Sequence, residues 1–146
     1  IDKLGELTDV ELVVGPTTGG ILLAFEIGRQ LDLPTAYAER VEDGASERAI
    51  KRDTAIARGT RVLVVDDVLT TGGSVVATLA AGRAFDADVV AVALLVDRSI
   101  SGLDFGLPMV SLTRLQIDSW EPHACPLCQQ GESLTKPGST VLANQN

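Results

Sequence analysis

The sequence contains one histidine, His123, and only two cysteines, Cys125 and Cys128, among its 146 residues. A Ser-His-Asp or Cys-His mechanism would have to use His123, which lies in a proline-rich, polar segment near the C-terminus. The chain has no G-x-S-x-G motif to supply a nucleophilic serine, so a hydrolase of either kind is disfavoured. Two cysteines are too few for a disulfide framework and the sequence shows no signal-peptide pattern, which favours a cytoplasmic protein.

Long apolar runs and an excess of positive charge are also missing. The longest apolar stretches, such as residues 89–96, fall far short of the roughly 20 residues that a membrane-spanning helix needs, so we expect no membrane contact. With 12 Lys+Arg against 20 Asp+Glu, the net charge of −8 argues against a broad nucleic-acid surface. Because positive charge is scarce, any phosphorylated ligand must be held locally. The apolar content of 45% predicts a soluble globular domain.

Short apolar runs alternate with amphipathic stretches along the chain. The predicted strands are residues 10–14, 35–38, 61–65 and 89–96, and the predicted helices are residues 21–31 and 74–85. The strands at 61–65 and 89–96 lack polar alternation, which predicts an α/β fold with a parallel twisted sheet flanked by helices. We expect a core at 1–117, in which the polar stretch 39–58 forms a mobile loop or a β-hairpin, and an irregular C-terminal tail at 118–146.

The most informative segment is residues 62–74, VLVVDDVLTTGGS. Asp66 and Asp67 follow a buried strand, at the end where parallel sheets bind ligands. A loop then opens a helix and supplies hydroxyls and flexible backbone for an anion, from Thr70, Thr71, Gly72, Gly73 and Ser74. The segment therefore predicts a phosphate site, beside which the two carboxylates bind ribose hydroxyls or a hydrated Mg²⁺. It is neither a P-loop nor a dinucleotide fingerprint, since both of those motifs are absent.

A second loop, residues 15–20 (GPTTGG), has the same chemistry in front of the predicted helix at 21–31. Thr17 and Thr18 offer hydroxyls, and Gly19 offers an accessible backbone. Alone, this loop would be as well explained by an ordinary strand-to-helix turn. Its occurrence together with the Asp66 segment favours a second anion-binding loop.

The run 62–74 resembles the phosphoribosyl-pyrophosphate (PRPP) signature of the type I phosphoribosyltransferases, and within that family the chain is most similar to the orotate enzymes. Supporting motifs are VVGP with the following GG at 13–20, YAER at 37–40, IKR at 50–52 and VDRS at 96–99. The resemblance implies the type I phosphoribosyltransferase fold. Because the chain starts at Ile1 and almost nothing precedes the first strand, we expect the family's N-terminal hood to be missing or minimal.

The resemblance implies Mg²⁺-dependent transfer of the phosphoribosyl group from PRPP to orotate, giving orotidine 5′-monophosphate (OMP) and pyrophosphate in pyrimidine biosynthesis. Asp66 and Asp67 would act in catalysis and hold Mg²⁺ through water, and Arg98 would contact orotate. One loop would hold the 5′-phosphate and the loop at Thr17–Gly19 the pyrophosphate. The polar stretch matches the family's catalytic loop, and its cations would be Arg40 and Lys51 for catalysis and Arg52 for substrate binding. A homodimer is also implied.

Several alternatives stay open. Arg98 could form a surface ion pair with Asp97, and Arg48 is better interpreted as a solvated loop charge than as a site residue. Cys125 and Cys128 are interpreted as paired thiols that pack a turn of the tail, rather than as metal ligands with His123 across a dimer. The chain could instead be a purine phosphoribosyltransferase, a non-catalytic regulator with the PRPP-binding fold, or an inactive copy.

Overall fold

The computed structural model describes residues 9–50, 54, 56–100 and 102–132, and it divides into two compact units, 1–116 and 117–146. The strands of the first unit are β1 (Leu12–Pro16), β2 (Thr35–Arg40), β3 (Arg48–Ile50), β4 (Arg61–Leu69), β5 (Asp88–Asp97) and β6 (Met109–Arg114). Its helices are α1 (Gly19–Leu31) and α2 (Gly73–Arg83). The second unit contains a 3-10 turn, η2 (Pro122–Ala124), and a short helix, α3 (Pro126–Gln129).

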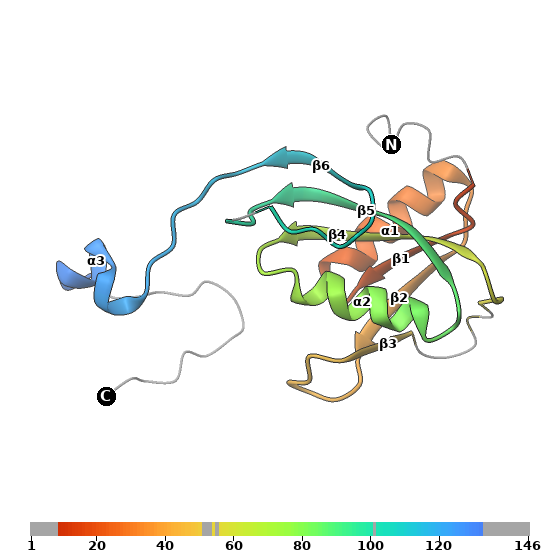
Figure 1. The fold of residues 1–146 in the computed structure, drawn as a ribbon, viewed down its shortest axis with the longest axis horizontal. Helices are drawn as coiled ribbons and strands as arrows, with labels where there is room; N and C mark the ends of the chain where they lie inside the picture. The colour runs from red at the N-terminus through yellow and green to blue at the C-terminus, as the bar shows by residue number, and fades with distance from the viewer. Residues whose placement is uncertain (1–8, 51–53, 55, 101, 133–146) are drawn as a thin grey trace. The chain divides into compact units, whose positions relative to one another are not determined.

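The six strands form one sheet in the order β3-β2-β1-β4-β5-β6. All neighbouring strands run parallel except β2 and β3, which form an antiparallel hairpin. Helices α1 and α2 cover opposite faces of the sheet, as Figure 1 shows. This arrangement confirms the predicted parallel α/β fold, and the polar stretch after residue 39 contains the hairpin that was one of its two predicted forms.

Strand β4 shows why the central strands lack polar alternation. Val62 and Val64 pack into the core on the α2 face, whereas Leu63 and Val65 pack into the core on the α1 face. All four side chains are fully buried. Because successive side chains point to opposite faces, a strand between two helical layers must be apolar at every position.

The observed elements differ from the predicted ones at several places. The turn predicted from Asp66 onward begins later, because the backbone of β4 continues to pair with β5 as far as Leu69. Strand β3 belongs to the hairpin that was one of two predicted forms, whereas strand β6 was not predicted, and the tail predicted to be irregular contains η2 and α3. No helix in the described part of the chain is long and apolar enough to cross a membrane.

Candidate functional site

Two loops meet at the carboxyl edge of the sheet. Strands β1 and β4 are parallel neighbours, so the loop after β1 and the loop after β4 leave the sheet side by side. Each loop leads directly into a helix, α1 or α2. The structure thus brings together the two segments that the sequence predicts to bind anions.

The two carboxylates of β4 point to opposite faces because they are consecutive residues of a strand. Asp66 lies on the α2 face, where its Oδ2 accepts a hydrogen bond from Ser74 Oγ at 2.6 Å. Asp67 lies on the α1 face, where its carboxylate contacts Gly19. An ideal Cβ built on Gly19 would be 2.0 Å from Asp67 Oδ2, so only glycine fits between this carboxylate and the start of α1.

Asp66 is enclosed by the protein itself. It is only 4% exposed, and its Oδ1 accepts the Asp67 N–H at 2.9 Å while Oδ2 accepts Ser74. Burial raises the pKa of Asp66, and the hydrogen bond from Ser74 opposes that rise. Because the single Ser74 hydroxyl hydrogen is directed at Asp66, the free donor of Ser74 toward a phosphate would be its N–H.

Asp67 is more open than Asp66. It is half-buried, and its Oδ1 accepts the Val68 N–H at 2.8 Å. Its Oδ2 faces Gly19 at the junction of the two loops. Oxygen donors of this kind suit a hydrated Mg²⁺, which is usually bound by one or two carboxylates together with substrate phosphates. The pair therefore fits the predicted metal, with Asp67 as the more accessible ligand.

Both helices begin without a side-chain cap. Thr18 precedes α1 and Gly72 precedes α2, neither makes a side-chain capping hydrogen bond, and neither first turn contains an acidic residue. Helix N-termini in this state present N–H groups and partial positive charge that an anion can satisfy. Thr18, Thr70, Thr71 and Gly73 are exposed beside them, and Thr17 and Gly19 are half-buried. The two loops therefore present hydrogen-bond donors side by side, as the predicted anion sites require.

Gly72 fixes the shape of the second loop. Its φ of +81° lies in the left-handed region that favours glycine. A Cβ at Gly72 would lie 2.8 Å from Leu103 and 3.3 Å from Phe105, which belong to the connection between β5 and β6. That connection therefore packs against the loop after β4.

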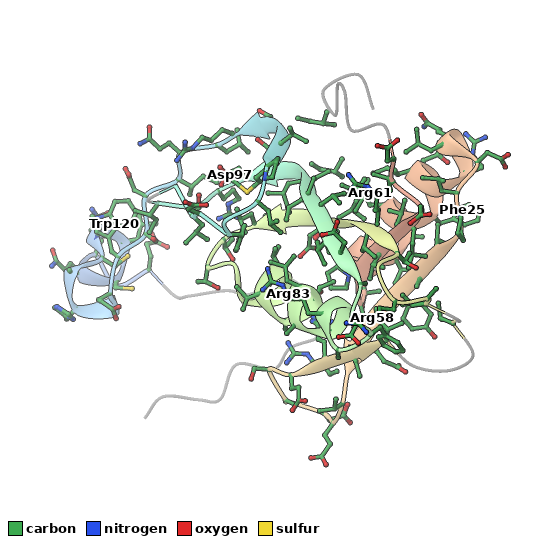
Figure 2. The ribbon with its side chains drawn as sticks, turned by 45° about the vertical axis from the view of Figure 1, so that its right-hand side comes forward. Phe25, Arg58, Arg61, Arg83, Asp97 and Trp120 are labelled. Carbon is green, nitrogen blue, oxygen red and sulfur yellow. The ribbon has the colours of Figure 1, made fainter. Side chains whose placement is uncertain are left out.

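Asp97 is the last residue of β5 and immediately precedes Arg98, the predicted contact to the base. Asp97, labelled in Figure 2, is 4% exposed, and its Oδ1 accepts Ser99 N–H at 2.8 Å and Ser99 Oγ at 2.6 Å. Its Oδ2 forms an ion pair with Arg114 at 3.7 Å. The bonds from Ser99 hold the pKa of Asp97 below its usual range, with a smaller contribution from the Arg114 charge. The alternative of an Arg98–Asp97 pair is wrong, because Asp97 is engaged by Ser99 and Arg114.

Arg98 is exposed, and its N–H donates to the Leu69 carbonyl oxygen at 2.8 Å. This backbone bond places Arg98 beside the end of β4. Its guanidinium forms no hydrogen bond or ion pair with the part of the chain that the structure describes. Arg114 was not singled out from the sequence, because its pairing with Asp97 depends on the alignment of β6 beside β5.

The hairpin contributes one unexpected cation. Arg48 was interpreted as a solvated charge, but it is only 9% exposed. Its Nη1 donates to Thr17 Oγ1 at 2.9 Å and to the Ala38 carbonyl at 3.0 Å, and its Nη2 donates to the Thr17 carbonyl at 3.2 Å. The solvated interpretation is therefore wrong. Burial lowers the pKa of Arg48 and the nearby Arg40 charge lowers it further, whereas the charge of Asp66 raises it.

Arg40 makes no side-chain hydrogen bond to either loop within the described residues. Arg40 is exposed and donates to the Ala45 carbonyl within its own hairpin. Lys51 and Arg52 lie outside the described residues. A sequence signal for Arg48 did exist, because Arg48 and Ile50 share one face of β3 and both are buried. The surrounding polar residues concealed it.

The second unit holds the two cysteines. Both are free and half-buried, and the nearby Cys128 lowers the pKa of Cys125. Cys125 immediately precedes α3, and Cys128 lies within it. Across the described residues, no group of three or more His, Cys, Asp and Glu side chains is arranged to hold a metal ion.

The fold and the paired loops define a class of protein. The sequence matches the phosphoribosyl transferase domain family over residues 6–121, and the chain belongs to that family. In particular, it is similar to orotate phosphoribosyltransferases. That of Caldanaerobacter subterraneus is 44% identical over 91% of this chain and 68% of its own length, and that of Thermotoga maritima is 42% identical over 96% and 73%.

Solved structures agree at the level of the fold. The orotate phosphoribosyltransferase of Aeropyrum pernix superposes with a TM-score of 0.59 at 29% identity, covering 75% of this chain and 64% of its own. The adenine phosphoribosyltransferase of Thermoanaerobacter pseudethanolicus gives a TM-score of 0.66 at 22% identity, covering 78% and 76%. The second comparison concerns the fold alone.

Proposed function

We propose that this chain catalyses the Mg²⁺-dependent transfer of the phosphoribosyl group from PRPP to orotate, giving OMP and pyrophosphate. The observation that carries the proposal is the position of Asp67 against Gly19, between two uncapped helix N-termini. A sugar that bears a phosphate at one end and a diphosphate at the other needs two anion sites with a hydroxyl-binding group between them. The orotate phosphoribosyltransferases at 42–44% identity support this choice within the family.

Each loop takes one end of PRPP. The loop Thr70–Ser74 and the start of α2 bind the 5′-phosphate through the N–H groups and the exposed Thr70 and Thr71 hydroxyls. The loop Thr17–Gly19 and the start of α1 bind the pyrophosphate. Asp67 faces the ribose hydroxyls, and Asp66 holds the end of β4 in place through Ser74.

Asp67, with Asp66 behind it, would hold Mg²⁺ through water beside the pyrophosphate of the substrate. When bound, the metal neutralises charge on the leaving pyrophosphate. The carboxylates stabilise the positive charge that develops on the ribose ring as the bond from C1′ to the pyrophosphate oxygen breaks. A ring nitrogen of orotate forms the new bond to C1′, so the protein needs no covalent nucleophile. Arg40, Lys51 and Arg52 supply positive charge toward the pyrophosphate, and Arg40 must release Ala45 to do so.

Arg98 is the residue that selects the base. Its guanidinium is exposed and unpaired within the described residues, beside the end of β4 that carries the carboxylates. A planar guanidinium can bind the carboxylate of orotate through two parallel hydrogen bonds. A purine base has no such carboxylate and gains nothing from this cation.

Two further properties belong to the proposal. The chain acts as a homodimer, as its resemblance to the family implies. It works in the cytoplasm, which its two free cysteines favour. Sedimentation of the purified protein tests the first property, and localisation of the tagged chain in its native host tests the second.

The experiment that tests the function is release of pyrophosphate from PRPP and Mg²⁺ with a panel of bases. We expect turnover with orotate, and none with uracil, adenine, hypoxanthine or xanthine. Turnover with a purine would overturn the assignment of the base while keeping the transfer reaction. Absence of turnover with every base, despite measurable PRPP binding, would overturn the proposal in favour of a non-catalytic PRPP-binding protein.

A further inference from the structure

The Arg48 guanidinium is the feature of the hairpin that the proposed reaction does not yet use. It reaches from β3 at the edge of the sheet to the loop after β1, where it donates to both the hydroxyl and the carbonyl of Thr17. A third bond, to the Ala38 carbonyl, holds the guanidinium against β2. The same Ala38 carbonyl accepts the Thr17 N–H at 3.0 Å, so Arg48 and Thr17 share one backbone anchor.

The bond to Thr17 Oγ1 determines what that hydroxyl can do. A threonine hydroxyl has one hydrogen to donate, and its oxygen can accept two. Because the Thr17 oxygen accepts from Arg48 Nη1, the hydroxyl hydrogen remains available for an anion outside the loop. Arg48 therefore orients Thr17 as a donor in front of α1.

The charge of Arg48 is also unusual in its surroundings. All three of its hydrogen bonds go to neutral oxygens, and no salt bridge joins it to a carboxylate within the described residues. Burial and the neighbouring Arg40 charge both disfavour the charged guanidinium, and the charge of Asp66 offsets these costs only in part. An anionic ligand at the Thr17 loop would relieve both of these costs.

We propose that Arg48 is a positioning residue for the diphosphate end of PRPP. It fixes the Thr17 loop in its anion-binding shape and supplies positive charge behind the loop. This inference rests on the proposed function and adds to it a residue that lies outside both loop motifs. It also links the β2–β3 hairpin to the pyrophosphate-binding loop, so a change at either one affects the other.

The test is calorimetric titration of inorganic pyrophosphate and of ribose 5-phosphate, each with Mg²⁺, into four proteins. These are the wild type, Arg48→Met, Arg48→Lys and Arg58→Met. Arg58 is the matched control, because its side chain is 88% exposed and it precedes β4, at the amino end of that strand and not at its carboxyl end where the two loops lie. Arg58→Met removes the same charge without touching the loop.

We expect Arg48→Met to weaken pyrophosphate binding about tenfold or more, the size associated with losing charge-assisted hydrogen bonds. Arg48→Lys keeps the charge but cannot span Thr17 and Ala38, so its affinity should be intermediate. Ribose 5-phosphate, which uses the other loop, should bind all four proteins within about twofold. In the complete reaction, KM for PRPP should rise while KM for orotate stays unchanged.

A purely structural Arg48 gives a different result. Arg48→Met would then lower the melting temperature while pyrophosphate affinity stayed at the wild-type value, and the inference would be wrong. If the wild type binds neither pyrophosphate nor PRPP, the proposed function fails, and the inference fails with it.

Thr17→Val keeps the test decisive should Arg48→Met not fold. This variant removes the hydroxyl that Arg48 orients and leaves the guanidinium in place. Pyrophosphate affinity should fall, and the effects of Thr17→Val and Arg48→Lys should be clearly less than additive, because both act through one contact. Fully additive effects would overturn the inference.

Discussion

Asp67 Oδ2 lies 2.0 Å from the position that a Cβ on Gly19 would occupy. The carboxylate at the end of β4 and the start of α1 are therefore in direct contact, and the two loops form one site. Neither loop can move away from the other without opening this contact. We therefore expect PRPP binding to depend on this contact.

Gly19→Ala should damage binding more than folding. The new methyl group must displace the Asp67 carboxylate or the start of α1, because the carboxylate approaches Gly19 too closely for any side chain to fit. We expect the affinity for PRPP with Mg²⁺ to fall at least about tenfold, measured by calorimetric titration. Gly102→Ala is the control, since its nearest neighbour is Arg114 Nη2 at 4.0 Å. Equal PRPP affinity in the two variants would contradict the single-site account.

Asp66→Asn should stabilise the free protein at neutral pH. Burial raises the pKa of Asp66, so its ionised form is penalised in the folded state. Below the unfolded pKa both states are protonated and the penalty is absent, whereas above the raised folded pKa it is fully present. The melting temperature of the variant should thus exceed that of the wild type at pH 7, and the difference should shrink as the pH is lowered. The prediction would be wrong if the melting temperature of the variant, compared with that of the wild type at the same pH, were lower at pH 7 than at pH 4.

Asp97 should have the opposite pH dependence. Its pKa is lowered by the bonds from Ser99, so its stabilising effect is present above the unfolded pKa and is lost as the pH falls through the folded value. Asp97→Ala should cost about 1–3 kcal/mol at pH 7 in urea unfolding. The difference in free energy of unfolding between the variant and the wild type should become smaller toward pH 3. A difference that does not change with pH would show that the lost stability comes from packing and not from the charge of Asp97.

Arg98→Ala should separate base binding from PRPP binding. The guanidinium lies at the end of β5 and makes no side-chain hydrogen bond to either loop within the described residues, so PRPP affinity should stay within about twofold of wild type. KM for orotate should rise at least about tenfold, because a bidentate contact to its carboxylate is lost. Steady-state kinetics with each substrate varied in turn measures both values. A rise in KM for PRPP alone would move Arg98 from the base to the phosphates.

The sheet was predictable from the sequence because its signals are local. Continuous apolar runs such as residues 61–65 identify strands covered on both faces, and glycine-rich loops mark the starts of helices. Strand β6 was not predictable in this way, because its residues are at most half-buried and its pairing with β5 defines it. The last residues of β4 were missed for the same reason, since pairing with β5 carries the strand past Asp66.

In the candidate site too, the features that depend on residues close in sequence were predictable, and those that depend on the fold were not. Asp66, Asp67 and both loops follow from motifs whose residues are neighbours in sequence. The division of labour between the two carboxylates does not, because it depends on Ser74 on one face and Gly19 on the other. Arg48 lies 31 residues from Thr17, and only the folded hairpin brings the two together.

Formation of OMP by wild type and by Asp67→Asn tests the central claim most directly. Chromatography of a mixture of PRPP, orotate and Mg²⁺ should show one OMP formed for each pyrophosphate released by the wild type. Asp67→Asn should be at least about 100-fold slower, whereas Asp86→Asn, at a carboxylate whose side chain is 73% exposed, should match the wild type. An Asp67→Asn variant as active as wild type, or a wild type that binds PRPP and forms no OMP, would contradict the account.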